Sequence, residues 1–172
     1  MIQKKLNVAC GSTPMKGYVN FDIRDIKGVD VVGDARKMPF KDNNFDEIVS
    51  MCFLEHLSDK EVYQVLSEMH RTAKPNAIIK LLVPHFKSFY SAISIQHKTF
   101  YCWHSPEVII QEVKRAKNID FTLKSKKYDM IGNFFGAKII QKIASIHPRF
   151  YERFLSGLIS VDAIEFEMEA KK

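Results

Sequence analysis

One glycine and two aspartates are placed where they can bind a polar ligand together. Gly11, Asp22 and Asp34 each stand at or just after the end of a short apolar run. The three runs are residues 6–9, 18–23 and 29–32, and their length and composition are typical of strands. Ligands of an open parallel sheet bind beyond the carboxyl ends of its strands. The spacing therefore predicts that the glycine and both carboxylates meet on one rim.

The remaining pattern predicts an α/β fold with a mostly parallel sheet. Ser58 and Glu61 form a capping-box sequence at the start of a helix that Lys74-Pro75-Asn76 ends. Pro84–Trp103 is expected to form a long lid rich in histidine, serine and aromatic residues. Further strands are expected at 46–51, 77–83, 119–128 and 161–169, and further helices at 105–117, 136–146 and 149–158. The 77–83 run is nearly all apolar, which predicts burial on both faces.

The connections between the first three strands are short. Ser12–Tyr18 and Arg24–Gly28 are the only residues available for them, whereas a crossover with its helix takes at least ~10–12 residues. The first crossover helices are therefore predicted to be reduced to turns, leaving one face of the sheet bare. A bare apolar face is sticky, so the helical insertion Gly136–Leu158 is expected to cover it or to form a homodimer interface. Contact of this insertion with a membrane surface ranks third.

Length and composition indicate a single domain over residues 1–172, with 46% hydrophobic and 27% charged residues. Three scattered cysteines fit a reducing compartment, and neither a signal peptide nor a membrane-spanning stretch is seen, so a cytoplasmic location is expected. The net charge of +6 is partly concentrated in Gln111–Tyr128. A solvated helix and edge strand explain this basic stripe better than nucleic acid does, so a nucleic-acid partner is not expected.

The order of motifs resembles that of the small class I S-adenosylmethionine-dependent methyltransferases, and in particular their "type 11" methyltransferase domain. The resemblance rests on LNVACGS, VNFDI, VVGDARKMPF, FDEIVSMCFLEHL and LSEMHRTAKPNAIIKLLVP, clearly over Lys5–Val83 and more loosely over Trp103–Tyr128. It implies a Rossmann-like sheet of seven strands, the last antiparallel. It also implies S-adenosyl-L-methionine as the cofactor.

The resemblance further implies which residues bind that cofactor. Gly11, which lacks a Cβ, would allow close approach of the carboxypropyl chain, and Asp22 would accept the ribose hydroxyls. Asp34 and the amide of Ala35 would face the adenine edge. The remaining cofactor-binding residues are predicted to be Ala9, Cys10, Met51, Cys52 and His56. The family's glycine-rich loop is reduced here. Asn7 stands at the position of its acid, Ala9 at that of its first glycine, and the position of its third glycine falls near Thr13, so that only Gly11 is kept.

Methyl transfer is an in-line displacement, so positioning supplies most of the acceleration. A base is needed only where the acceptor loses a proton. His85, directly after the strand at 77–83, and His97, within the lid, are the first catalytic candidates, and Glu55 is the next. No metal is predicted, because His85, His97, Cys102 and His104 match no zinc spacing.

These residues predict an enzyme that transfers a methyl group to a small-molecule or glycan acceptor. The reduced glycine loop keeps a second hypothesis open, that the fold binds a ligand or a protein partner without turnover. A third is an RNA methyltransferase that uses the basic stripe. SMCF follows the strand at 46–51 where an amine-methylating enzyme of nucleobases would carry an N-P-P-[YF]-type motif, which speaks against this third hypothesis.

Overall fold

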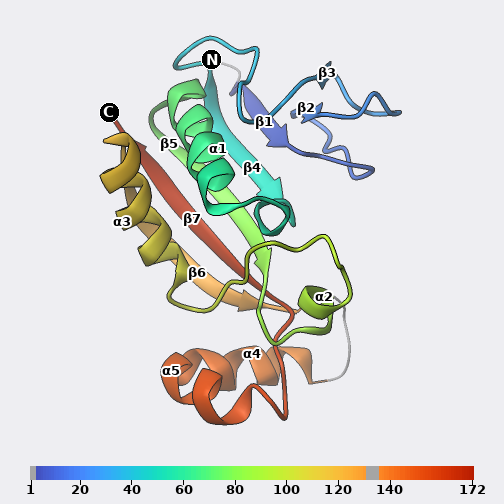
Figure 1. The fold of residues 1–172 in the computed structure, drawn as a ribbon, viewed down its shortest axis with the longest axis vertical. Helices are drawn as coiled ribbons and strands as arrows, with labels where there is room; N and C mark the ends of the chain where they lie inside the picture. The colour runs from blue at the N-terminus through green and yellow to red at the C-terminus, as the bar shows by residue number, and fades with distance from the viewer. Residues whose placement is uncertain (1–2, 131–135) are drawn as a thin grey trace.

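The computed structural model describes residues 3–130 and 136–172, which build a seven-stranded sheet in the order β3-β2-β1-β4-β5-β7-β6 (Figure 1). Strands β1 to β5 are mutually parallel, and β7 is antiparallel to both of its neighbours. The strands are β1 (Lys5–Val8), β2 (Val19–Asp22), β3 (Val31–Val32), β4 (Phe45–Met51), β5 (Ala73–Pro84), β6 (Asp120–Asp129) and β7 (Ala163–Lys171). The predicted Rossmann-like sheet with an antiparallel last strand is confirmed.

Two long helices cover one face of the sheet, α1 (Asp59–Thr72) and α3 (Ser105–Lys117) (Figure 1). The predicted capping box starts α1: the Ser58 backbone N–H donates to the Glu61 carboxylate at 2.9 Å. Only turns join β1 to β2 and β2 to β3, as predicted. The other helical elements are short: η1 (Leu54–His56), α2 (Phe89–Ala92), α4 (Ala137–Ile146), α5 (Pro148–Phe150) and η2 (Tyr151–Leu155), a single π-helical turn.

The core lies between the sheet and the layer of α1 and α3. Leu6, Ile48, Ile79 and Met168 are in register across β1, β4, β5 and β7, and all four are fully buried. Val62, Val65, Leu66 and Met69 of α1 are the buried residues of that helix that pack into the same core. This continuous apolar row fixes the sheet against one layer of helices and holds the carboxyl ends of the parallel strands at a common edge.

The opposite face of the sheet carries a row of ion pairs. Lys5 on β1 pairs with Glu47 on β4 at 3.5 Å, and Lys80 on β5 lies 3.9 Å from Glu47 and 3.5 Å from Glu167 on β7. Lys124 and Lys127 of β6 extend the pattern to Glu169 and Glu165. The expectation of a bare apolar face was therefore wrong, because each of these strands carries at least one charged residue on this face that pairs with a charge on the neighbouring strand.

The row of ion pairs also shows that the prediction of a β5 buried on both faces was wrong. Ile79, Leu81 and Val83 are buried under the helices, whereas Ile78, Lys80 and Leu82 alternate with them and are only half-buried. The boundary of β5 also differs from its prediction, because Lys74-Pro75-Asn76 belongs to the strand. Its pairing with β4 shifts register between Phe45 and Glu47, and a β-bulge of this kind accommodates a proline that cannot donate a ladder hydrogen bond.

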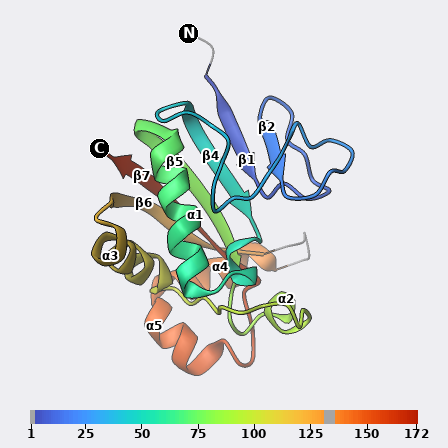
Figure 2. The same cartoon turned by 45° about the horizontal axis from the view of Figure 1, so that its top comes forward.

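The helical insertion lies beyond the ends of β5, β6 and β7 rather than over the charged face (Figure 1). Gln141 of α4 donates to the Asp129 carboxylate at the end of β6. Tyr151 of η2 stacks edge-on against Tyr128 of β6, with the ring centroids 5.4 Å apart. Figure 2 shows α2 of the lid at this same end of the molecule. The expected helix over Arg149–Leu158 is α5 followed by the π-turn, and it begins after a non-helical His147.

Reversing the charge of Lys80, at the centre of the row of ion pairs, tests how much this row contributes to stability. Lys80→Glu places three carboxylates side by side on adjacent strands, so we expect the free energy of unfolding to fall by about 1 kcal/mol at low salt. About 1 M NaCl should restore most of it, since the Debye length is then ~3 Å. Urea unfolding at both salt concentrations measures this. Lys41→Glu, in an exposed loop, is the control, and an equal loss in both variants would contradict the role of the row.

Candidate active site

A cavity of about 860 Å³ opens at the carboxyl ends of the parallel strands. Every residue predicted to bind the cofactor lines it: Ala9, Cys10, Gly11, Asp22, Asp34, Ala35, Met51, Cys52 and His56. Residues from the lid, including Ile95 and Lys98, close the opposite side. The structure therefore brings together the residues that the sequence placed on one rim. Their role in binding stays a prediction.

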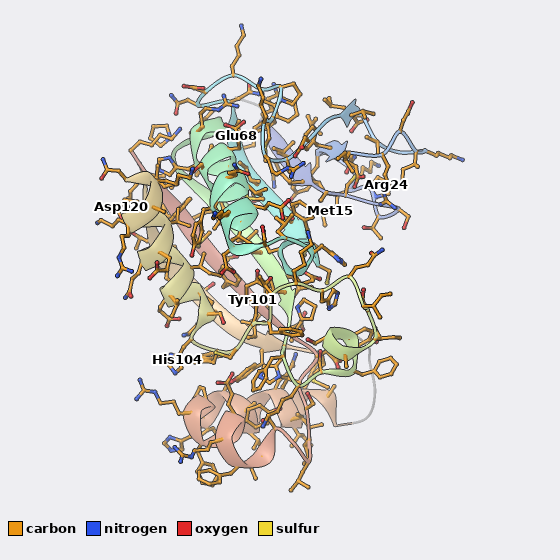
Figure 3. The ribbon with its side chains drawn as sticks, viewed as in Figure 1. Met15, Arg24, Glu68, Tyr101, His104 and Asp120 are labelled. Carbon is orange, nitrogen blue, oxygen red and sulfur yellow. The ribbon has the colours of Figure 1, made fainter. Side chains whose placement is uncertain are left out.

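The buried carboxylate of Asp22 ties the first two strands together at this rim. It accepts hydrogen bonds from the Gly11 backbone N–H at 2.8 Å and from the backbone and side chain of Arg24 at 2.9 and 3.1 Å. Burial alone would raise the pKa of Asp22, but the bonds from Arg24 and Gly11 outweigh it and hold this pKa below its usual value. Arg24 lies on the loop that follows β2 (Figure 3). Asp22 is thus a fixed negative charge.

Asp34 follows β3 and forms a second, more exposed acidic point. Arg36 donates to both of its carboxylate oxygens, the closest approach being 2.6 Å, and this pairing lowers the pKa of Asp34. The same guanidinium reaches Glu61 of α1 at 2.8 Å. Arg36 therefore fixes the direction of the Asp34 carboxylate at the mouth of the cavity.

Two residues other than glycine adopt left-handed backbone conformations in the cavity wall. Ala9, directly after β1, has φ 54°, and Cys52, directly after β4, has φ 51°. This conformation costs a residue with a Cβ of the order of 1 kcal/mol or more, and such strain is concentrated at functional sites. Ala9 stands where the family that the sequence resembles has a glycine, and φ 54° is a conformation that glycine adopts without this strain.

Glu55, His56 and His97 form a group behind this wall, with their ligand atoms within 4.8 Å of one another. Glu55 is buried, burial raises its pKa to about 7, and its Oε2 has no hydrogen-bond partner among the described residues. The His56 and His97 rings lie edge to face with their centroids 4.8 Å apart. Burial first, and then the charge of His97, lowers the pKa of His56. The group can hold a proton or a cation, and His56 is its member that lines the cavity.

The lid is fastened to this group through backbone contacts. The backbone N–H groups of Lys98 and Thr99 donate to the Glu55 carbonyl at 2.7 and 3.2 Å. His97 Nδ1 lies 3.0 Å from the Ser91 carbonyl oxygen. Buried Tyr101 bonds to Thr99 at 2.9 Å and is labelled in Figure 3. His97 and Glu55 are thus brought together, although neither lines the cavity, and their catalytic role stays a prediction.

His85 is placed elsewhere. Its side chain is fully buried, does not line the cavity, and lies 3.3 Å from the Glu152 carboxylate of η2. Glu152 also accepts from the Trp103 backbone N–H at 2.5 Å and from the Tyr128 hydroxyl at 3.3 Å. Burial in this setting raises the pKa of Tyr128 well above its usual value. The His85 side chain thus links the end of β5 to η2 and has no access to the cavity, and its predicted catalytic role stays a prediction.

Sequence reasoning missed the basic partners of the two rim acids. Arg24 and Arg36 each follow their aspartate by two residues, in Asp-x-Arg, and each donates both a backbone and a side-chain bond to it. The repeated spacing was a usable signal, because a carboxylate can accept from the backbone two residues later. Glu61 and Lys98 carried no such signal, since α1 and the lid bring them to the rim from distant positions.

Comparison with known proteins agrees with this geometry. Residues 6–81 match the family model described as "Methyltransferase domain". A segment of 51 residues is 43% identical to norajmaline N-methyltransferase from Rauvolfia serpentina, and it covers 30% of this chain. The match spans only 17% of the length of that curated relative.

Solved structures share the fold. A SAM-dependent methyltransferase from Archaeoglobus fulgidus superposes with a TM-score of 0.63 at 15% identity, covering 97% of this chain and 86% of that one. One from Methanosarcina mazei gives 0.62 at 14% identity, covering 98% and 92%. Residues 6–81 therefore resemble a methyltransferase domain, and the chain shares the fold of these SAM-dependent methyltransferases. The cofactor that this domain implies is S-adenosyl-L-methionine.

The left-handed turn at Ala9 can be tested by substitution. Ala9→Val should lower the free energy of unfolding by about 2 kcal/mol, because a β-branched residue fits φ 54° poorly. Ala9→Gly should not lower it, because relief of the strain offsets the added freedom of the unfolded chain. Denaturant unfolding measures both. Ala116→Val, on an exposed position of α3, should cost well under 1 kcal/mol, and an equal cost at both positions would contradict strain at Ala9.

The raised pKa of Glu55 predicts a pH-dependent stability. A carboxyl with a folded pKa of about 7 stabilises the fold fully below its unfolded value of 4.5, and this contribution is lost as the pH rises through 7. Glu55→Gln should therefore gain stability over wild type between pH 4.5 and 8, by up to about 3 kcal/mol. Thermal unfolding across this range tests it.

Glu61→Gln provides a control of opposite sign. Bonds from Ser58 lower the pKa of Glu61 to about 2, so its contribution is present above pH 4.5 and is lost as the pH falls. This variant should be less stable than wild type at neutral pH and approach it in acid. A Glu55→Gln profile parallel to that of wild type would show that Glu55 titrates normally.

Proposed function

We propose that this chain transfers a methyl group from S-adenosyl-L-methionine to a small-molecule or glycan acceptor. The observation that carries the proposal is the single cavity that joins the strained turns at Ala9 and Cys52 to the fixed carboxylates of Asp22 and Asp34. These features suit the cofactor: the turns allow close approach of backbone, and the two acids accept hydroxyl and amine hydrogens. The small-molecule N-methyltransferase that resembles part of the chain supports a small acceptor.

The cofactor supplies an electrophilic methyl group on a positively charged sulfur. Residues of this chain orient the two reactants and keep water out, as an in-line displacement demands. Asp22 and Asp34 hold the nucleoside end of the cavity. Met51 and Cys52, at the end of β4, border the opposite end, beside His56.

An acceptor hydroxyl would lose its proton on the side of His56. The lowered pKa of this imidazole keeps it neutral and able to accept a proton at neutral pH. Glu55 lies directly behind it with an unpaired oxygen, and His97 flanks it. The three side chains together form a route by which the proton leaves the cavity.

Calorimetric titration with S-adenosylhomocysteine tests the proposal. Wild type should bind, and Asp34→Ala should bind at least tenfold more weakly, because it removes an acceptor at the mouth and releases Arg36. Asp25→Ala is the matched control, since Asp25 is an exposed acid on the loop after β2 that does not line the cavity. Glu55→Gln should keep the affinity of wild type and lose turnover of a hydroxyl acceptor.

The other two hypotheses predict different results. Undetectable binding at millimolar ligand would sink the proposal and favour a fold that no longer uses the cofactor. Binding without methyl transfer to any extract fraction would favour a ligand-binding or partner-binding role. Methyl transfer to RNA with a steep dependence on salt would favour the RNA methyltransferase.

A further inference from the structure

The helical insertion presents apolar side chains to solvent in regular stripes. Ile139, Ile143 and Ile146 stand at i, i+4 and i+7 on α4, which places them on one side of that helix. Phe150, Phe154 and Leu158 repeat at i, i+4 and i+8 along α5, η2 and the turn after it. All six are among the exposed large hydrophobic residues, from 47% at Ile143 to 84% at Leu158. An unpaired apolar surface of this extent marks an interaction site.

A basic stripe runs beside each apolar stripe. Lys138 and Lys142 are one turn apart on α4, Arg149 and Arg153 are one turn apart on the following helical segment, and all four are exposed. The Arg153 guanidinium lies 5.7 Å from the centroid of the Phe154 ring. We name these four basic residues and the six apolar ones the basic-apolar face.

The only acid between residues 136 and 160 points away from this face. Glu152 is turned inward, where His85, Tyr128 and the Trp103 backbone bind its carboxylate. The exposed formal charges of the segment are therefore all positive. His104 lies where α3 begins and accepts a bond from Arg149 at 3.2 Å (Figure 3). The field at this end of the molecule favours a negatively charged partner.

The lid extends the apolar surface toward the cavity. Phe89, Ile93 and Ile95 are exposed, and Ile95 is as accessible as in an extended chain. Figures 1 and 2 both place α2 of the lid and the helices of the insertion at the same end of the molecule. Neither of the two described cavities is lined by a residue beyond position 135. The face thus offers protruding side chains rather than a groove for a partner's helix or strand.

We propose that the basic-apolar face binds the surface of an anionic lipid bilayer. Helices with apolar and basic stripes side by side lie in the plane of a membrane interface, with apolar side chains among the acyl chains and Lys or Arg at the headgroups. No helix within 3–130 or 136–172 is long and apolar enough to cross a bilayer, so the contact is with the surface. In a symmetric homodimer a second copy of the face would offer the four basic residues no acidic partner, which disfavours a second copy.

Flotation with vesicles tests this inference with the full chain, without cofactor or acceptor, so its outcome is independent of methyl transfer. Wild type should float with vesicles of phosphatidylcholine and 30% phosphatidylglycerol at low salt. It should stay at the bottom with phosphatidylcholine alone. Raising the salt to about 0.5 M should weaken flotation, because the attraction of the headgroups is screened.

Charge reversal with a matched control separates this face from the net charge of the chain. Lys142→Glu with Arg153→Glu should lower the partition coefficient at least twentyfold, since each basic residue contributes about fivefold. Lys41→Glu with Lys117→Glu changes the net charge equally, at exposed positions away from the face, and should keep most of the binding. Equal loss in both double variants would overturn the assignment to this face.

The apolar stripe has its own pair of variants. Ile143→Ser should reduce flotation several-fold, whereas Val108→Ser, a similarly exposed position on α3, should not. Circular dichroism establishes that each variant is folded. Wild type that never floats with anionic vesicles overturns the proposal. So does a dimer by light scattering that Ile143→Ser dissociates, because the face would then belong to a second copy.

Discussion

A sheet covered by helices on only one side must make its other side compatible with water. In this chain the turns between β1, β2 and β3 are too short to hold helices, so one layer formed by α1 and α3 buries the row of Leu6, Ile48, Ile79 and Met168. The other face alternates lysine and glutamate across five strands, with Lys80 between Glu47 and Glu167. Ion pairs of this exposure contribute little stability each. Their main effect is to keep the face polar, which prevents the sheet from associating through it.

The same shortening determines how the rim of the cavity is built. Where a helix would normally begin after β1, the chain makes a turn, and the Gly11 N–H has no helical role. The Asp22 carboxylate accepts that N–H and so links the end of β2 to the end of β1. The strained turns at Ala9 and Cys52 complete the wall. The rim therefore depends on side-chain bonds and on backbone strain in place of a helix terminus, which suits a cofactor without a phosphate.

The order and type of the elements could be predicted because apolar runs, the Ser58–Glu61 capping box and short connections are local signals. The rim of the cavity could be placed because the carboxyl ends of parallel strands share one edge, which brings Gly11, Asp22 and Asp34 together whatever their distance in sequence. The charged face of the sheet was missed because Lys80 is a single charge within AIIKLLV. Only the register of the strands shows that Lys80 lies beside Glu47 and Glu167. The position of His85 was missed because its partner, Glu152, lies 67 residues away.

Glu152 connects the insertion to the lid. Its carboxylate contacts His85 at the end of β5. It also accepts hydrogen bonds from the Trp103 backbone N–H at the end of the lid and from the Tyr128 hydroxyl of β6. Turning the one acid of the insertion inward has two consequences: it fastens η2 against the sheet, and it leaves the outer side of the helices with positive charge only. The lid that borders the cavity and the helices that carry the basic-apolar face are consequently both held by the inward-facing Glu152 carboxylate. A partner bound to that face would thus be fixed relative to the mouth of the cavity.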